Sequence, residues 1–310
     1  MKLMIIKTNL VVSIILSLWC SHLMAADYTL PSDGSRLIGE VKNHVVVKGD
    51  FFQQLAEKYD VGFLALISAN PNVDPFLPEE GTSLVIPTSM LLPYGKREGI
   101  VINLPELRLY YFPTGQDKVY VFPVGIGQEG LATPAMTTFV SDKRKNPVWR
   151  PTKAMKERYF KKHGKHLASE VPPGASNPFG KYALRLGFSE YLIHGTNQRF
   201  GVGMRASSGC VRMYDDDIKW LFDNVNVNTS VKIVNQPIKM SYENGNKQLI
   251  EIHSALAESQ TKEKDASNDG SSQVSSAIPD TVKRFVGGKE KYITTIKQLM
   301  NKPKGLVVEL

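Results

Sequence analysis

The sequence predicts a mainly β protein of more than one domain, with a small βααβ unit ahead of a larger β-rich region. Two observations predict this class. Residues 98–235 contain runs of β-branched, aliphatic and aromatic residues that are separated by turns. Residues 43–88 instead place two apolar-faced helices between two short strands. The 310 residues are long enough for both units and for a C-terminal extension.

The first 25 residues have the composition of a cleavable secretory signal. A short basic start precedes the apolar run Leu10–Trp19, which is too short to span a bilayer, and small residues follow at Ala25 and Ala26. We therefore expect a signal over residues 1–25, cleavage near Ala25 and an exported protein. Lipid attachment at Cys20 is an alternative, but the residues before it do not suit lipoprotein processing.

Charge and cysteine content narrow the function classes. The formal net charge of +8 suits solubility or the binding of polyanions. The basic residues form no ordered stripe interleaved with aromatic residues, so we expect no nucleic-acid binding. Once the signal is removed, Cys210 has no cysteine left to pair with, although disulfides are the rule in exported proteins. This lone thiol indicates a chemical role.

The elements of the small unit follow from local patterns. Strands are predicted at His44–Val47 and Ser83–Ile86. Apolar residues at i, i+3, i+4 and i+7 predict a helix from Phe52 to Tyr59, with Asp50 placed to cap its start. A second helix over Phe63–Ala69 ends before a proline, which cannot continue it.

This unit resembles the LysM domain, a module that binds peptidoglycan and chitin. The resemblance rests on Gly49-Asp50, Leu55-Ala56, Tyr59 and Asn70-Pro71, and it departs from the family at Phe51, where Thr or Ser is usual. It implies binding of N-acetylglucosamine chains. The alternative is an adaptor that only orients the next domain.

The larger region opens with three predicted strands, Gly99–Leu104, Leu107–Phe112 and Lys118–Val124, of which the last two form a hairpin. A polar excursion rich in proline and glycine follows between Asn146 and Gly180, and a helix is predicted within it over Lys153–Lys162. Long inserts of this kind often form a lid beside a functional site.

The chemistry concentrates where a buried strand, Tyr191–His194, ends in a histidine. Cys210 follows in a loop that precedes an amphipathic helix. Gly209 allows a positive φ or the close approach of a carbonyl group, and backbone N–H groups beside the cysteine can form an oxyanion hole. A thiol is activated by a base or a positive neighbour that lowers its pKa, and His194 and Arg212 are candidates for these two roles.

Other interpretations use the same residues. Cys210 could be a small buried hydrophobic residue, although the flanking polar residues argue against this. A zinc site is a second alternative, but its inner spacing lacks the usual ligand geometry. His44 and His253 have no chemical partners nearby in the sequence. The zinc alternative would combine His163, His166, His194 and Cys210.

The segment IHGTNQRFGVGMRASSGCVRMYDDDIKWLF, residues 193–222, resembles the catalytic signature of the L,D-transpeptidases, or YkuD-type domain. The phrase VPPGASNPFGKYALRLG, residues 171–187, is similar to the subgroup that attaches Braun's lipoprotein to peptidoglycan in the Gram-negative periplasm. The resemblance implies a β-sandwich catalytic domain of the L,D-transpeptidase type, with a cysteine nucleophile and a periplasmic location.

The resemblance also implies residue roles. Cys210 matches the nucleophile, His194 the general base, and Gly195 the residue whose carbonyl orients the imidazole ring. The backbone N–H groups of Gly209 and Cys210 match the oxyanion donors. Arg212 matches the position that binds a substrate carboxylate.

Ser208 also faces the substrate in this comparison, and it stands where many members have a second histidine. That histidine cannot be the essential base here, which supports His194 in this role. The resemblance implies that no metal or other cofactor is required, because one peptide bond is exchanged for another.

The implied reaction joins Cys210 as a thioester to the meso-diaminopimelate of a tetrapeptide stem and releases D-alanine. The acceptor amine is the C-terminal lysine of a lipoprotein, or alternatively a second diaminopimelate in a 3–3 crosslink, a free D-amino acid, or water in a carboxypeptidase. A non-enzymatic peptidoglycan-binding protein is the remaining alternative. The expected partners are stem peptides, glycan, an outer-membrane lipoprotein and a periplasmic thiol reductase, and we expect a monomer.

The C-terminal residues show weaker signals. We expect a linker over residues 236–277 and an extension over residues 278–310, with a helix over Lys289–Met300. The extension either docks on the catalytic domain or contacts a partner.

Overall fold

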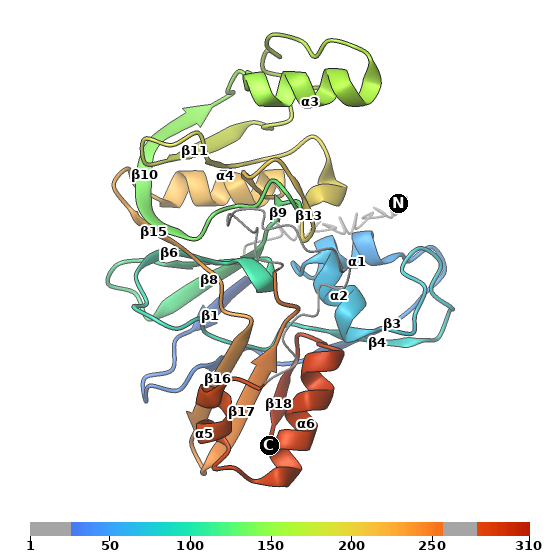
Figure 1. Ribbon diagram of the computed structural model, residues 1–310, viewed down its shortest axis with the longest axis vertical. Coiled ribbons are helices and arrows are strands. Elements are labelled where there is room, and N and C mark those ends of the chain that lie inside the picture. The colour runs from blue at the N-terminus through green and yellow to red at the C-terminus, as the bar shows by residue number, and fades with distance from the viewer. Residues whose placement is uncertain (1–25, 257–277) are drawn as a thin grey trace, which may run out of the picture.

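The computed structural model describes residues 26–256 and 278–310 (Figure 1). The predicted signal over residues 1–25 lies outside the described residues, as does much of the predicted linker. No helix in the described part of the chain is both long and apolar enough to cross a membrane.

A curled nine-stranded sheet forms the centre of the molecule and confirms the mainly β prediction. Its strands are β1 (Ala26–Thr29), β6 (Gly99–Asn103), β7 (Arg108–Phe112), β8 (Lys118–Pro123), β10 (Met136–Lys145), β11 (Tyr182–Leu186), β12 (Leu192–His194), β14 (Val211–Arg212) and β15 (Ser230–Val234). They lie in the order β1-β8-β7-β6-β15-β10-β11-β12-β14.

The curl of this sheet arises in β10. Its first half pairs with β15 and its second half with β11, and the register shifts between Val140 and Asp142. Such bulges bend a strand and increase its twist. The bend carries β11, β12 and β14 to the far edge of the sheet, where a short parallel pair, β9 (Ile126–Gly127) and β13 (Arg205–Ser207), adjoins them.

Helix α4 (Asp215–Asn224) packs on this edge of the sheet. Its apolar face, with Ile218 and Leu221, is fully buried in the main core beside Ile193 of β12 and Val211 of β14. Burial of such a side chain contributes about 1.5–3 kcal/mol. The predicted amphipathic helix after Cys210 is therefore confirmed, and it anchors β12, which ends in His194, and β14, which follows the cysteine.

The predicted βααβ unit is confirmed. Two helices lie over an antiparallel strand pair, and their apolar faces share one buried core. A short antiparallel pair, β2 (Leu37–Ile38) with β5 (Met90–Leu91), flanks the unit in the chain. The four elements are β3 (Lys42–Val45), α1 (Phe52–Lys58), α2 (Phe63–Ala69) and β4 (Ser83–Ile86).

The predicted cap at Asp50 is wrong. Helix α1 begins after Phe51 without a side-chain cap. The Asp50 carboxylate instead accepts a hydrogen bond from the Val47 N–H, at 2.8 Å, and lies 2.8 Å from His44 Nε2. His44 Nδ1 is in turn 2.8 Å from the Tyr59 hydroxyl. His44 therefore has two partners that its sequence surroundings did not indicate.

The linker predicted over residues 236–277 is wrong in its first part. Residues 238–252 form a hairpin, β16 (Ile238–Glu243) and β17 (Lys247–Ile252), around an Asn-Gly turn, and β18 (Val307–Glu309) adds a third strand. Helices α5 (Asp280–Phe285) and α6 (Glu290–Asn301) pack against this sheet and close a separate core. The predicted C-terminal helix is confirmed as α6.

A buried interdomain cluster of five residues joins the C-terminal sheet to the central sheet: Glu106, Arg108, Lys239, Glu251 and His253. Lys239 Nζ lies 2.8 Å from Glu106 Oε2 and 2.9 Å from Glu251 Oε2. Arg108 Nη1 bridges the same two carboxylates at 3.1 and 3.0 Å. Burial raises the pKa of both carboxyls, but Lys239 and the other cations outweigh it and lower the pKa of each.

Candidate active site

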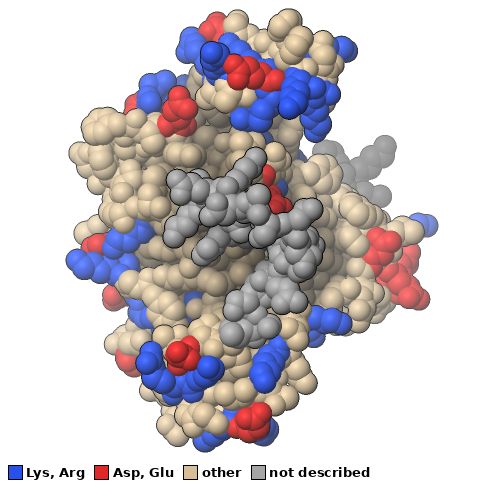
Figure 2. All heavy atoms as spheres, viewed as in Figure 1, with Lys and Arg blue, Asp and Glu red and all other residues tan. Residues whose placement is uncertain are grey.

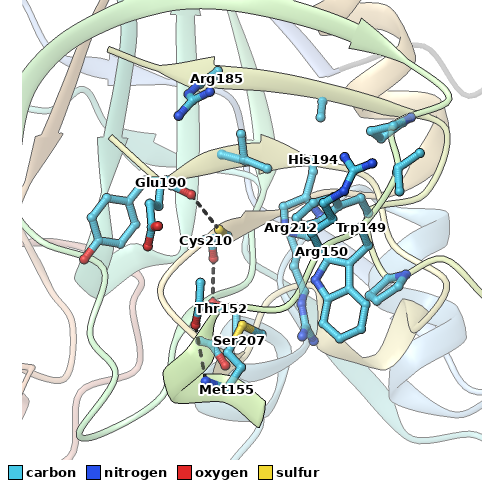
Figure 3. A pocket seen from close by; sticks show the side chains of 18 of the residues that line it. Trp149, Arg150, Thr152, Met155, Arg185, Glu190, His194, Ser207, Cys210 and Arg212 are labelled. Carbon is cyan, nitrogen blue, oxygen red and sulfur yellow. Dashed lines mark hydrogen bonds between the residues drawn. The ribbon is translucent and has the colours of Figure 1, made fainter. Parts of the chain in front are cut away.

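A cavity of about 610 Å³ opens at the edge of the sheet where β11, β12 and β14 lie side by side (Figure 3). Cys210, His194, Arg212 and Ser208 all line it. The structure therefore brings together the residues that the sequence singled out, with Gly195 and Gly209 adjoining them in the chain.

Strand pairing explains why the cysteine and the histidine meet. β12 and β14 are parallel neighbours with Ile193 opposite Val211 and His194 opposite Arg212. Because Cys210 comes directly before β14, this register brings it next to the strand that carries the histidine. The opposed pair of His194 and Arg212 then places the arginine in the same cavity.

The loop that carries Cys210 is fixed by hydrogen bonds and by a backbone conformation that favours glycine. Gly209 has a φ of +110°, and a Cβ atom there would lie 2.9 Å from the Tyr191 ring. The Thr133 hydroxyl donates to the Gly209 carbonyl at 2.8 Å, and the Ser207 hydroxyl donates to the Cys210 carbonyl at 2.6 Å. The Gly209 N–H already donates to Ser207 Oγ at 3.1 Å. The Cys210 N–H is therefore the better candidate to bind an oxyanion.

His194 is held in one orientation by its neighbour. Its Nδ1 lies 2.6 Å from the Gly195 carbonyl oxygen, which can only accept, so Nδ1 carries the proton and Nε2 is left as a proton acceptor. The residue is 3% exposed. Burial, with a smaller contribution from the charge of Arg212, lowers the pKa of His194 to about 4 against the opposing effect of the hydrogen bond to Gly195. The imidazole is therefore neutral at pH 7.

Cys210 is a protonated thiol at neutral pH. Burial raises its pKa, and this effect outweighs the Leu192 backbone and Arg212, which lower it. Its Sγ donates weakly to the Glu190 carbonyl oxygen at 3.9 Å (Figure 3). The expected fall in the thiol pKa is wrong for the free site, because burial is the larger effect. The cavity holds a neutral thiol and a neutral imidazole.

Arg212 is a half-buried cation without a carboxylate partner in the described chain. In the described chain its Nε atom has no hydrogen-bond partner and its guanidinium forms no ion pair with a carboxylate. Its Nη1 packs so close to Gly201 that a Cβ atom on that residue would lie only 2.7 Å from it. A buried charge normally has a partner, so this guanidinium is prepared for an anionic ligand.

The sequence prediction missed a set of residues that complete the cavity. Trp149, Arg150 and Arg158 come from the excursion between β10 and β11, where helix α3 (Lys153–His163) is capped by the Thr152 hydroxyl, 3.2 Å from the Met155 N–H. Figure 2 shows lysine and arginine side chains gathered around this excursion. The density of basic residues from 143 to 166 was the available signal. The missed lining residues include Arg144, Trp149, Arg150, Arg158, Arg185 and Tyr191.

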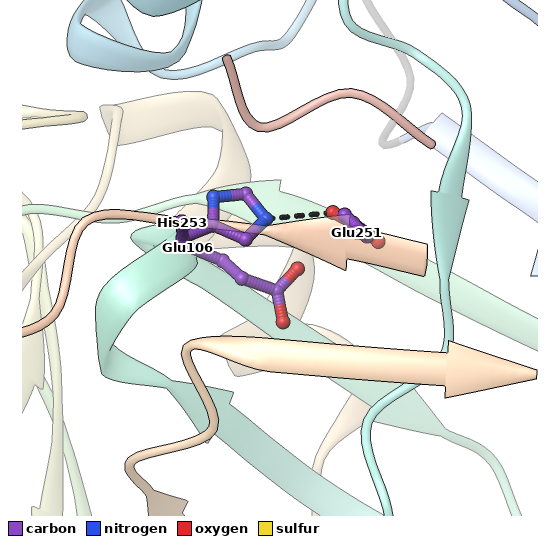
Figure 4. Close-up of side chains that lie close together, drawn as sticks. All are labelled: Glu106, Glu251 and His253. Carbon is purple, nitrogen blue, oxygen red and sulfur yellow. Dashed lines mark hydrogen bonds and ion pairs between the residues drawn. The ribbon is translucent and has the colours of Figure 1, made fainter. Parts of the chain in front are cut away.

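The zinc alternative is not supported by the geometry. His163 packs on Tyr159 and His166 on Phe160, on or next to α3, and neither lines the cavity. Among the described residues, metal-ligand geometry occurs in Glu106, Glu251 and His253 of the interdomain cluster (Figure 4). Lys239 already supplies the positive charge between those carboxylates, so that group is a poor fit for a metal ion.

Comparisons with known proteins agree with this arrangement. Residues 97–233 match the L,D-transpeptidase catalytic domain, residues 44–87 the LysM domain and residues 237–310 the L,D-transpeptidase C-terminal domain. The chain is 53% identical over 239 residues to the probable L,D-transpeptidase YcfS of Escherichia coli, covering 76% of this chain and 74% of that protein. It is 38% identical over 311 residues to the probable L,D-transpeptidase ErfK/SrfK of the same organism, covering 98% and 97%. The chain therefore belongs to the L,D-transpeptidase family.

Proposed function

We propose that this protein is a peptidoglycan L,D-transpeptidase that works through a thioester on Cys210. One observation carries the proposal: a buried neutral imidazole with a free Nε2 shares a cavity with the lone thiol and with an unpaired guanidinium. These are the three components that acyl transfer to an amine needs, namely a nucleophile, a base and an anion clamp.

Acylation begins when the substrate carbonyl enters the cavity. Cys210 Sγ attacks this carbon as its proton passes to His194 Nε2, and the resulting oxyanion accepts a hydrogen bond from the Cys210 N–H. His194 then donates the proton to the departing amine, which leaves as D-alanine. The Gly195 carbonyl stabilises the imidazolium, because it accepts the Nδ1–H bond throughout.

Deacylation reverses these proton transfers. An acceptor amine attacks the thioester, His194 takes a proton from this amine, and the thiolate leaves and is reprotonated. One peptide bond is formed for the one broken, so the cycle requires no external energy source. Water as the acceptor would instead release a shortened stem, which would make the protein a carboxypeptidase.

The charges of the cavity favour substrates with carboxylates. Four further arginines line it beside Arg212, one from β10, one from β11 and two from the excursion. Arginine binds a carboxylate in a bidentate manner. The diaminopimelate of the donor carries one such group, and a lysine at the C-terminus of a lipoprotein carries another next to its amine. We therefore propose this lysine as the principal acceptor, with diaminopimelate in a 3–3 crosslink as the alternative.

The LysM domain supports the same assignment, because this module implies peptidoglycan binding. Its loop after α2 exposes Phe76 and Leu77, at 72% and 81% of their surface. Apolar side chains of this kind suit the faces of sugar rings. We propose that this loop contacts the glycan strand while the stem peptide enters the catalytic cavity.

We further propose that the protein is exported to the periplasm and that a thiol reductase keeps Cys210 reduced there. Cys210 is a free cysteine, and it lines an open cavity. An oxidised Cys210 could not form a thioester.

The test is product analysis on purified tetrapeptide muropeptides. The protein is incubated with and without a peptide that ends in lysine, and the products and the intact protein are weighed by mass spectrometry. We expect a stem adduct on the wild-type protein, a lysine-linked product only with the acceptor, and neither with Cys210→Ala. An adduct on Cys210→Ala would contradict the nucleophile assignment. If the same hydrolysed stem is the only product with and without the acceptor peptide, the protein is a carboxypeptidase.

A further inference from the structure

The first described residues are part of the fold itself. β1 (Ala26–Thr29) is the edge strand of the nine-stranded sheet and pairs with β8 from Ala26 opposite Val121 to Thr29 opposite Lys118. The chain thus enters the catalytic sheet at the residue that follows the expected cleavage point.

The backbone nitrogen of Ala26 meets the half-buried carboxyl group of Asp60. It donates to Asp60 Oδ2 at 3.2 Å, across from the edge strand to the turn between α1 and α2 of the LysM domain. Burial raises the pKa of Asp60 to about 7, and the Ala26 hydrogen bond lowers it. No lysine, arginine or histidine in the described part of the chain forms an ion pair with Asp60.

A second carboxyl group at this junction is also without a counter-charge. Asp217 lies in the first turn of α4 and is 8% exposed. Its Oδ2 has no hydrogen-bond partner in the described chain, and the same holds for Oε1 of Gln53 on α1. Burial raises the pKa of Asp217, and the nearby charge of Asp60 raises it further. At this junction between the LysM and catalytic domains Arg199 pairs with Glu57, but neither Asp60 nor Asp217 has a cationic partner among the described residues.

We propose that cleavage between Ala25 and Ala26 creates this missing cation, and that the new α-ammonium group of Ala26 binds the carboxylate of Asp60. A signal peptidase adds one water to the peptide bond: the oxygen goes to the Ala25 carbonyl carbon, and the Ala26 nitrogen keeps the bonding electron pair and becomes protonated. A single neutral N–H donor at 3.2 Å is thereby replaced by a charged donor with three hydrogens.

Processing then completes the interface between the edge strand, the LysM domain and the catalytic domain. In an unprocessed chain Asp60 forms no ion pair among the described residues, and a desolvated carboxylate without an ion pair is costly. A processed chain carries an ion pair at the same place. The signal peptide would thus act on folding as well as on export, since its removal tightens the junction of the two domains.

The pH dependence of stability distinguishes the two forms. In an extended chain Asp60 has a folded pKa of about 7, above its unfolded value, so stability rises as the pH falls from 7 to 5. In the processed chain the ammonium group lowers the pKa of Asp60. Protonation of Asp60 then no longer increases the stability as the pH falls from 7 to 5. Other groups facing Asp60 are Asp217 and Tyr214 at α4, Tyr28 on β1 and Arg108 on β7, and they are common to both forms.

The experiment compares thermal unfolding of two full mature chains, one that begins at Ala26 and one with Gly-Ser added before it. Each is also made with Asp60→Asn, and with Asp27→Asn as a matched control, because Asp27 forms an exposed ion pair with Lys118. At pH 7 we expect the Ala26 chain to melt about 5 °C higher than the extended one. Asp60→Asn should remove this difference, and Asp27→Asn should keep it.

Two further measurements complete the test. Sequencing of the exported protein should give Ala26 as its first residue. The α-amino group, followed by NMR, should titrate above its ordinary range of about 7.7–8.0. Equal melting temperatures for the two wild-type chains, a difference that persists in Asp60→Asn, or a different first residue would overturn the proposal.

Discussion

The interdomain cluster and the catalytic cavity both hold charged side chains away from water, but the cluster pairs all of them, whereas Arg212 of the cavity is left unpaired in the described chain. In the cluster every carboxylate meets Lys239 and Arg108. In the cavity Arg212 has no carboxylate partner in the described chain, and the proton-accepting side of His194 is free. A buried charge without a partner lowers stability, so it persists where a ligand uses it. Pairing therefore separates a structural cluster from a reactive one.

Removal of the base gives the largest expected effect. His194→Ala should lower kcat by about 10²–10⁴-fold, the usual contribution of a general base, while the melting temperature changes little. In the wild-type protein the neutral form of His194 is active, and its pKa of about 4 keeps it neutral above pH 5. We therefore expect kcat/KM to lack an acid limb between pH 7.5 and 5.5. An acid limb with a pKa of about 6.5 would instead show that the base is a histidine with an ordinary pKa.

Removal of one cation from the cluster should act on stability instead. Lys239→Met leaves two buried carboxylates with less compensation, and we expect a loss of about 3–5 kcal/mol in the free energy of unfolding, measured with urea. Lys247→Met is the matched control, because Lys247 forms an exposed pair with Glu309 and should cost less than about 1 kcal/mol. An equal loss of unfolding free energy for both substitutions would show that the buried cluster is no more important for stability than the exposed pair.

Removal of Arg212, the unpaired cation, should lower activity rather than stability. Arg212→Gln should lower kcat/KM by about 10-fold to 100-fold, as expected for a lost charge-assisted hydrogen bond, without lowering the melting temperature. Lys219→Gln is its control, because Lys219 lies outside the cavity and forms an exposed pair with Asp223 on α4. We expect its kcat/KM to stay within about twofold. A destabilised Arg212→Gln protein with normal kinetics would show that this arginine is structural.

The sequence predicted what depends on near neighbours in the chain. The helices α1 and α2 follow from local periodicity, and the group of Cys210, His194 and Arg212 lies within one short signature. The interdomain cluster was missed because its partners are far apart, with Arg108 and Glu251 separated by 143 positions. β1 was missed for the same reason, because its four residues become a strand only by pairing with β8.

The direction of the Cys210 pKa also required the structure. Sequence neighbours suggested a lowered value, but the burial of the thiol depends on strands and loops that meet only in the fold. A raised pKa has a benefit in an oxidising compartment. Thiolates are the species that oxidise, so a protonated Cys210 is protected until the substrate arrives. The proposed reductase would then act as a repair system.

The central claim is that the free site holds a neutral thiol beside a neutral imidazole, and the pH dependence of Cys210 alkylation tests it most directly. The rate of reaction with iodoacetamide is followed by intact mass from pH 5 to pH 10. We expect a single ionisation above the ordinary pKa of a thiol, about 8.5, with little reaction below pH 7. His194→Ala should leave this profile in place. A fast plateau below pH 7 that disappears in His194→Ala would show a thiolate–imidazolium pair and contradict the account.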